Sequence, residues 1–190
     1  MLYTRNGSYP AALPASITLS NGFIRTDPSS FTVDEIADAG YVEAPAQPDY
    51  DPATEQLGWD GEVWTVTTLP PPTEEQVDAE RDRRIAAGFS FGGVIYQSRP
   101  EDRENIMGAS TAALGAMMQG AQAGDYRWHG GDSDFVWIAA DNSIHPMDAQ
   151  TVYAFGLAAM EHKTAHIFAA RAIKDADPIP FDFTDNGYWP

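Results

Sequence analysis

Residues 70–98, PPPTEEQVDAERDRRIAAGFSFGGVIYQS, mark the place where the character of the sequence changes. The three prolines at the start stiffen the chain as an extended spacer. Thr73 and the glutamine three positions later form a capping-box pattern, and apolar residues at helical spacing continue until Gly88. The rest of the segment predicts a β-hairpin over 89–98, with Gly92 and Gly93 at its turn. A boundary between two kinds of structure therefore lies at the prolines.

A second helix follows this hairpin. A capping-box pattern over 98–101 begins it, and it runs to about Gln119 through a segment rich in alanine and glycine. Gly108 and Gly115 lie inside this helix, where each glycine costs roughly 1 kcal/mol relative to alanine. We therefore expect a close neighbour at these glycines, either another helix or a second copy of this one.

A second hairpin and a long third helix complete the C-terminal part. Residues 126–138, YRWHGGDSDFVWI, predict a hairpin that turns around 130–133. Pro146 then opens a helix with Asp148 in its first turn, and the helix ends near Lys174. Its expected apolar stripe consists of Val152, Phe155, Ala159, Ile167, Ala170 and Ile173.

The N-terminal segment, residues 1–69, has short apolar runs separated by turn-forming residues. Strands are predicted within 13–19, 23–24 and 40–42, and a single helical turn over 32–39. This segment is therefore rich in strands and loops, in contrast to the helical part that follows the prolines.

The clearest local signal in the N-terminal segment is QLGWDGEVWTVTTL, residues 56–69. Asp60-Gly61 predicts a two-residue turn, because both turn positions favour a positive φ. Trp59 and Trp64 flank this turn and are expected to pack against each other across the hairpin. The alternative is that the two tryptophans form an exposed binding patch.

Together these patterns predict an α+β protein. A small β-rich module over 1–69 is joined by a Pro-rich linker, 70–76, to a helical domain over 77–174 with three helices and two hairpins. An acidic aromatic tail occupies 175–190.

The composition excludes several classes of function. The chain has 190 residues, of which 28 are acidic and 11 basic, so its net charge is −17. Such a surface repels phosphate backbones and anionic membranes, and no apolar run approaches the ~18 residues that a membrane span needs, so we expect a soluble protein without nucleic-acid or membrane partners. The absence of cysteine excludes disulfides, iron–sulfur clusters and thiol catalysis.

The histidines in EHKTAH, residues 161–166, are the feature that most resembles a catalytic motif. His162 and His166 are spaced i, i+4 on one helical face, as zinc ligands can be. The motif is not HExxH, because Lys163 follows the first histidine and supplies no general base. A third ligand would have to come from His129, His145 or a carboxylate, so we predict no metal site.

No other pattern indicates an enzyme. The chain has no GxSxG nucleophile elbow and no P-loop lysine, and its many carboxylate pairs are expected at this net charge. We therefore predict no catalytic residues and no cofactor.

The tail, DADPIPFDFTDNGYWP, combines four aromatic residues with four aspartates. Its aromatic side chains either fold back onto their own domain or insert into a partner, and the sequence leaves both possibilities open. The candidate partner-binding residues are Trp59, Trp64, Phe181, Phe183, Tyr188 and Trp189.

The stretch RRIAAGFSFGGVIYQSRPEDRENIMGASTAAL, residues 83–114, is followed by FVWIAADN and by a helix ending AMEHKTAHIFAARAIKD. Together they resemble a domain of uncharacterised function in tailed-bacteriophage tail proteins, and the likeness covers roughly residues 41–174. The matching positions are Arg84, Ile85, Gly88, Phe89, Asp102, Asn105, Ile106, Trp128, Asp141, Asn142 and His162.

The resemblance implies a role in a phage virion or in fibre assembly, without enzymatic activity. The expected function is a tail component that binds a tail-fibre or baseplate subunit, as a fibre-assembly chaperone or as a retained adaptor. The alternative is a standalone structural fibre or spike protein of the virion that contacts the host surface. The expected location is the virion tail, the host cytoplasm during assembly, or both, and a homotrimer is implied only by analogy with fibres.

Overall fold

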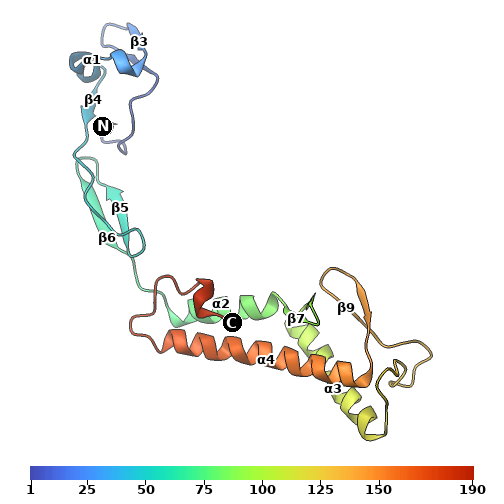
Figure 1. The fold of residues 1–190 in the computed structure, drawn as a ribbon. Helices are drawn as coiled ribbons and strands as arrows, with labels where there is room; N and C mark the ends of the chain where they lie inside the picture. The colour runs from blue at the N-terminus through green and yellow to red at the C-terminus, as the bar shows by residue number, and fades with distance from the viewer. The chain divides into compact units, whose positions relative to one another are not determined.

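The computed structural model describes all residues from 1 to 190 and divides the chain into two compact units, residues 1–70 (unit 1) and 71–190 (unit 2). The fold class is α+β, as predicted, with small hairpins in unit 1 and three main helices in unit 2 (Figure 1). The two units are described separately below.

Unit 1 consists of short elements. They are β1 (Tyr3–Arg5), β2 (Ser16–Thr18), β3 (Ile24–Thr26), the 3₁₀ turn η1 (Pro28–Ser30), α1 (Val33–Asp38), β4 (Tyr41–Glu43), β5 (Glu55–Trp59) and β6 (Trp64–Thr68). The strands form three separate antiparallel pairs, β1 with β4, β2 with β3, and β5 with β6. The expected helical turn is α1, whose N-terminus has a capping box between Thr32 and Glu35.

The core of unit 1 is very small. Its buried hydrophobic side chains are those of Ile17, Ile36 and Ala39. Each strand pairs with one other strand, and a single bridge between Tyr3 of β1 and Ala11 is the one contact beyond these pairs, so most strand edges lack a sheet partner.

The turn of the β5–β6 hairpin differs from the predicted one. Trp59 pairs directly with Trp64, so four residues form the loop instead of two. Gly61 has a φ of +109°, but Asp60 does not adopt a positive φ. Instead, the Asp60 carboxylate accepts hydrogen bonds from the backbone N–H groups of Glu62 and Val63, which closes the wider loop.

Unit 2 is built around one long helix. Its elements are α2 (Glu74–Ala86), β7 (Phe89–Phe91), β8 (Val94–Tyr96), α3 (Pro100–Met118), β9 (Val136–Ile138), β10 (Ile144–Pro146), α4 (Ala149–Lys174) and the 3₁₀ turn η2 (Asn186–Tyr188). Both α2 and α3 pack against α4, with α2 alongside it and α3 crossing it (Figure 1). The chain then returns, so that its C-terminus lies beside α2 and α4.

The core of unit 2 is centred on Phe155, which is fully buried. The ring centroid of Phe155 lies 4.8 Å from that of Tyr96 and 5.1 Å from those of Phe89 and Trp137. These rings come from β7, β8, β9 and α4. The hairpins of unit 2 are thus held on the helices by aromatic packing.

Two helix starts differ from the predictions. Helix α3 is capped at Arg99 and not at Ser98, because the carboxylate of Asp102 accepts a hydrogen bond from the Arg99 backbone N–H. Helix α4 begins after Asp148, whose side chain accepts the Thr151 N–H, so this aspartate is the N-cap and not a first-turn residue. Pro146, expected to open the helix, ends strand β10.

The predicted hairpin over 126–138 is wrong. Residues 136–138 form β9, but they pair with β10, residues 144–146, further along the chain. The turn lies at Asn142, whose φ is +66°, and the Asp141 carboxylate accepts the Ser143 N–H. Asparagine tolerates this left-handed conformation, so a DNS turn replaces the expected glycine turn.

The glycines of α3 do not mark the close helix contact that we expected. A Cβ added at Gly108 or Gly115 would meet nothing within 4 Å. The close approach lies instead at Gly156 of α4, where an added Cβ would be 2.5 Å from the Cβ of Ser110. The glycine that lets α3 cross α4 is therefore on the other helix.

Candidate functional site

The two tryptophans predicted in unit 1 form an aromatic cluster with Tyr9. The ring centroids of Trp59 and Trp64 are 5.2 Å apart, and that of Tyr9 lies 5.3 Å from Trp64. The indole N–H of Trp59 donates to the Gly7 carbonyl, and that of Trp64 donates to the Pro45 carbonyl. Both tryptophans are half-buried. They therefore pack within unit 1 and also leave part of each ring exposed.

The C-terminal tail folds back onto unit 2. Trp189 is only 7% exposed and packs in a cluster with Val77 of α2 and Ala170 and Ile173 of α4. Its indole N–H donates to the carbonyl of Phe183, 2.8 Å away. Of the two alternatives for the tail, fold-back and insertion into a partner, the structure thus shows fold-back for Trp189.

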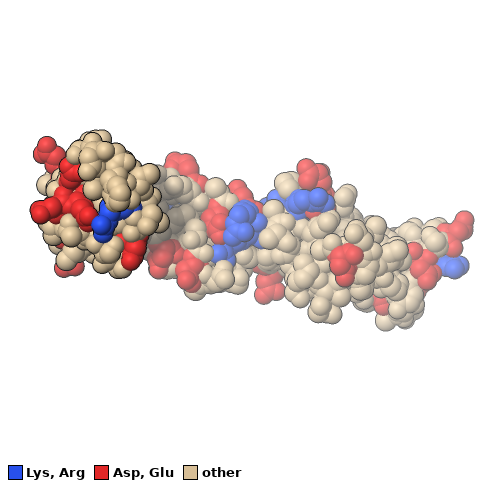
Figure 2. All heavy atoms as spheres, turned by 90° about the horizontal axis from the view of Figure 1, so that it is seen from above, with Lys and Arg blue, Asp and Glu red and all other residues tan.

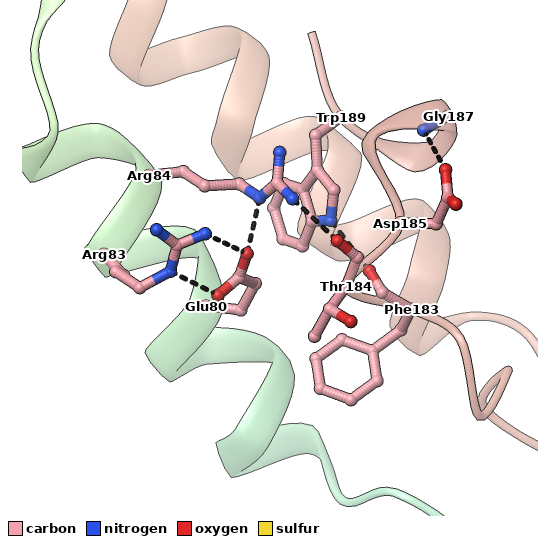
Figure 3. A network of polar contacts seen from close by, with 8 residues as sticks. All are labelled: Glu80, Arg83, Arg84, Phe183, Thr184, Asp185, Gly187 and Trp189. Carbon is pink, nitrogen blue, oxygen red and sulfur yellow. Dashed lines mark hydrogen bonds and ion pairs between the residues drawn. The ribbon is translucent and has the colours of Figure 1, made fainter.

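An ion-pair network fixes this tail to α2 (Figure 3). Arg84 donates from Nε to Glu80, at 2.6 Å, and from Nη2 to the Thr184 carbonyl, at 2.8 Å. The Arg84 guanidinium also lies over the Trp189 ring, 5.1 Å from the ring centroid, at cation–π distance. Arg83 and Arg84 both bind the Glu80 carboxylate, and the hydrogen bonds from Arg83 contribute most to lowering its pKa to about 2.

The other aromatic residues of the tail are more accessible. Tyr188 is 39% exposed, and its hydroxyl donates to Asp182. Phe181 and Phe183 are half-buried, the latter against the Trp189 cluster. The structure therefore brings Phe183 and Trp189 together in unit 2, and Trp59 and Trp64 together in unit 1.

The paired histidines lie side by side on α4, with ring centroids 4.4 Å apart. His166 Nδ1 bonds to the His162 carbonyl, and His162 Nε2 bonds to the Ile85 carbonyl. Burial, followed by the charge of His166, lowers the pKa of His162. No cluster of three or more histidine, aspartate or glutamate side chains is placed to hold a metal ion. Both histidine rings thus form hydrogen bonds to backbone carbonyls of unit 2.

A groove between α3 and α4 is the feature that the sequence analysis missed. It encloses about 310 Å³, and Ile106 and Ala159 are the most buried of its lining residues. Its other lining residues are Arg103, Met107, Ser110, Thr111, Gly156, Leu157, Met160 and Lys163. Apolar atoms dominate this surface.

The groove continues into an exposed apolar row on α4. Leu157, Met160, Ile167 and Phe168 are between 42% and 69% exposed, although their spacing puts them on one face of the helix. The predicted apolar stripe includes Ile167, but this residue is 42% exposed, so its placement with the buried residues of the stripe is wrong. Helical spacing was the only signal for this row in the sequence. It shows which residues share a face of the helix, but it does not show which of two apolar faces a neighbouring helix covers.

The charges at the groove are unusual for this chain. Seven of the nine basic residues of unit 2 form ion pairs, namely Arg81, Arg83, Arg84, Arg99, Arg127, Arg171 and Lys174. The remaining two, Arg103 and Lys163, have no ion-pair partner, and both line the groove. Elsewhere, aspartates and glutamates are scattered over the surface seen in Figure 2, with fewer basic residues among them.

These features describe an α+β protein with exposed apolar side chains in both units and an apolar groove between α3 and α4. The chain belongs to a family described as a domain of unknown function (DUF4376), whose model matches residues 70–185. The match begins at the proline run and includes most of the tail, whereas it does not reach the segment 41–69 that we included in the resemblance. No curated protein and no solved structure matches the chain. None of its helices combines the length and the apolar character that a membrane crossing requires.

Proposed function

We propose that this protein is a non-enzymatic component of a bacteriophage tail. In this proposal it binds a tail-fibre or baseplate subunit, either as a fibre-assembly chaperone or as an adaptor that stays in the virion. The sequence resemblance to phage tail proteins supports the phage context, and the exposed apolar surfaces support a binding role.

The observation that carries this proposal is the small core of unit 1. Only Ile17, Ile36 and Ala39 are buried hydrophobic residues in 70 residues of chain. Isolated two-stranded hairpins are marginally stable in water, and domains of this size need a full core, a metal, disulfides or a partner. No cysteine is present to form a disulfide.

Unit 1 also exposes the kind of side chain that a partner would cover. Phe23, Ile24, Val33 and Val42 are each at least 60% exposed. Burial of these side chains by another chain would stabilise unit 1 at about 25 cal/mol per Å² of apolar surface. A fibre or baseplate subunit that buries these side chains would thereby stabilise unit 1.

Quantitative mass spectrometry of purified, intact phage particles tests the proposal. An adaptor is expected at a stoichiometry that matches the symmetry of the tail. A chaperone is expected in infected lysate and absent from particles, and purified full-length protein should then bind the fibre subunit in a pull-down. Absence from particles together with no binding to any fibre or baseplate subunit would refute the proposal.

A hollow in unit 2 favours the second candidate, a structural fibre or spike protein that contacts the host surface. It encloses about 740 Å³ and is lined by Trp128, His129 and Phe135 together with small residues of α3, among them Ala112 and Gly115. Aromatic side chains that line a hollow of this kind can stack on a sugar ring. This candidate predicts a stable oligomer without a partner and binding to host surface glycans, which size analysis and a glycan array would detect.

A further inference from the structure

We propose that the groove between α3 and α4 binds an acidic amphipathic helix presented by the partner protein. This inference rests on the proposed function and deepens it, because it names the contact and the chemistry of the segment that is recognised. Three observations carry it: the apolar lining of the groove, the row of exposed side chains on α4, and the two unpaired cations.

The shape of the surface suits a helix. From Leu157 to Phe168 the exposed row extends over about three turns of α4, roughly 16 Å at 1.5 Å per residue. A partner helix of similar length would place apolar side chains in the groove beside Met107 and Met160. Methionine side chains adapt to the shape of a bound surface, which suits them to this position.

The cations give the position of an acidic residue on the partner. Arg103 and Lys163 line both the apolar groove and an adjoining hollow of about 490 Å³. The lining of this hollow also includes Ile85, Ile167 and the ion pair of Arg81 with Asp82, whose carboxylate is thus already engaged. A bound helix would therefore pass apolar residues, then a carboxylate beside the two cations, and then apolar residues again.

The unpaired state of these cations is informative because carboxylates are plentiful in this chain. Acidic residues outnumber basic ones by 28 to 11, and every other basic residue of unit 2 forms an ion pair with an aspartate or glutamate. The side chain of Arg103 donates only to the Ser98 carbonyl. A carboxylate from another molecule would supply the missing charge.

A second copy of this chain is a poorer occupant. In a two-fold contact the same patch meets itself, and the residues that line the groove include two cations and no carboxylate, so the patch of a second copy supplies no counter-charge. The charge pattern therefore favours a different protein with an acidic apolar helix.

Fluorescence anisotropy with designed peptides tests this inference on the full-length protein. The probe is a small panel of labelled helical peptides, each about four turns long, with leucines at i, i+3, i+4 and i+7 spacing and a glutamate between two leucine pairs. A matched panel carries lysine in place of each glutamate. At least one glutamate peptide should bind saturably, and roughly tenfold more tightly than its lysine counterpart.

Variants of α4 give the controls. Lys163→Glu should weaken binding of the glutamate peptide roughly tenfold and strengthen binding of the lysine peptide. Met160→Glu should abolish binding of both peptides by placing a charge on the apolar surface. A further control outside α4, Arg127→Glu, makes a like charge change at an exposed residue of unit 2 that lies outside both the groove and the exposed row, and it should leave binding within about twofold.

Three results would overturn the inference. The first is that no peptide of the panel binds, and the second is that glutamate and lysine peptides bind equally. The third is a wild-type dimer in sedimentation velocity that Met160→Glu dissociates, since the occupant would then be a second copy.

The test also separates this inference from the proposed function. If a fibre or baseplate subunit binds and Lys163→Glu leaves that binding unchanged, the groove assignment fails and the tail function stands. If the glutamate peptides bind as expected and no tail subunit does, the groove chemistry stands and the tail function fails.

Discussion

At the scale of single residues, Glu80 connects α2 to the tail through Arg84. Its carboxylate accepts hydrogen bonds from two arginines, and its side chain is only 11% exposed. One of these arginines, Arg84, contacts both Thr184 and the ring of Trp189. Because charge-assisted hydrogen bonds in a partly buried position are strong, Glu80 should matter more for stability than the other surface carboxylates of α2.

We expect Glu80→Gln to lower the free energy of unfolding by roughly 1–3 kcal/mol at neutral pH. The pKa of Glu80 is lowered from 4.5 to about 2 in the folded protein, so its stabilising effect is complete above 4.5 and is lost as the pH falls toward 2. Urea unfolding at several pH values should show the two proteins converging over that range. Asp82→Asn removes a more exposed carboxylate of the same helix and should change stability by less than about 0.5 kcal/mol.

His162 should make stability sensitive to mild acid. Burial and the charge of His166 lower the pKa of His162, whereas hydrogen bonds to the Ile85 and Arg84 backbone act in the opposite direction and Arg103 adds to the lowering. A lowered histidine pKa means that folding favours the neutral ring. The stabilisation is therefore complete above the unfolded value, about 6.5, and is lost as the pH falls below it.

Thermal unfolding at about pH 7.5 and about pH 5 measures this effect. The wild-type protein should lose more stability on acidification than His162→Gln, which cannot gain the proton. Equal losses in the two proteins would show that other groups cause the acid sensitivity.

At the scale of elements, the crossing of α3 and α4 depends on Gly156. A side chain there would collide with Ser110, so we expect Gly156→Ala to destabilise the protein by roughly 1–3 kcal/mol, despite the higher helix propensity of alanine. Gly108→Ala and Gly115→Ala provide matched controls on α3, where an added Cβ meets nothing. Each should stabilise the protein by up to about 1 kcal/mol in denaturant unfolding.

The reverse order, with Gly156→Ala tolerated and Gly108→Ala destabilising, would contradict this account of the crossing. Such a result would instead support the expectation that the glycines of α3 lie against a close neighbour. Because nothing in this chain lies within 4 Å of an added Cβ there, that neighbour would be another molecule.

The elements also differ in how well local sequence specified them. Helix α2 has the predicted start, because Thr73 and Gln76 form both bonds of a capping box. Gly92 and Gly93 form the turn of the β7–β8 hairpin with positive φ at both positions, as predicted. These features depend on residues a few positions apart, so the sequence pattern was sufficient to identify them.

Strand β9 shows the opposite case. Residues 126–135 contain the glycines expected at a turn, yet β9 pairs with β10 and turns through Asn142. Trp128 instead donates its indole N–H to the Met147 carbonyl, and Phe135 packs against the main core of unit 2. Packing of these aromatic side chains onto the helices outweighed the local turn signal. A local sequence pattern does not register such packing between distant residues.

At the scale of the whole molecule, the end of the chain belongs to the core of unit 2. Because Trp189 is buried against α2 and α4, we expect Trp189→Ala to lower the free energy of unfolding by roughly 2–4 kcal/mol. Tyr188→Ala, one residue earlier and 39% exposed, should cost less than about 1 kcal/mol. Denaturant unfolding followed by circular dichroism would compare the two.

Equal and small effects of these two substitutions would contradict the packing of the tail. They would instead favour a tail whose aromatic side chains serve a partner. The six predicted partner-binding residues thus differ in what they contribute to the folded chain, and Trp189 is the most buried of them.

The sequence by itself determined the α+β class, the capped start of α2, the end of α4 at Lys174 and the first hairpin of unit 2. Each depends on caps, glycines and prolines that act over a few residues. Only the tertiary structure decided which apolar face of α4 is buried, where Trp189 packs, and that Arg103 and Lys163 line the same groove. These outcomes arise from contacts between residues far apart in the chain, whose burial depends on which neighbouring element covers them.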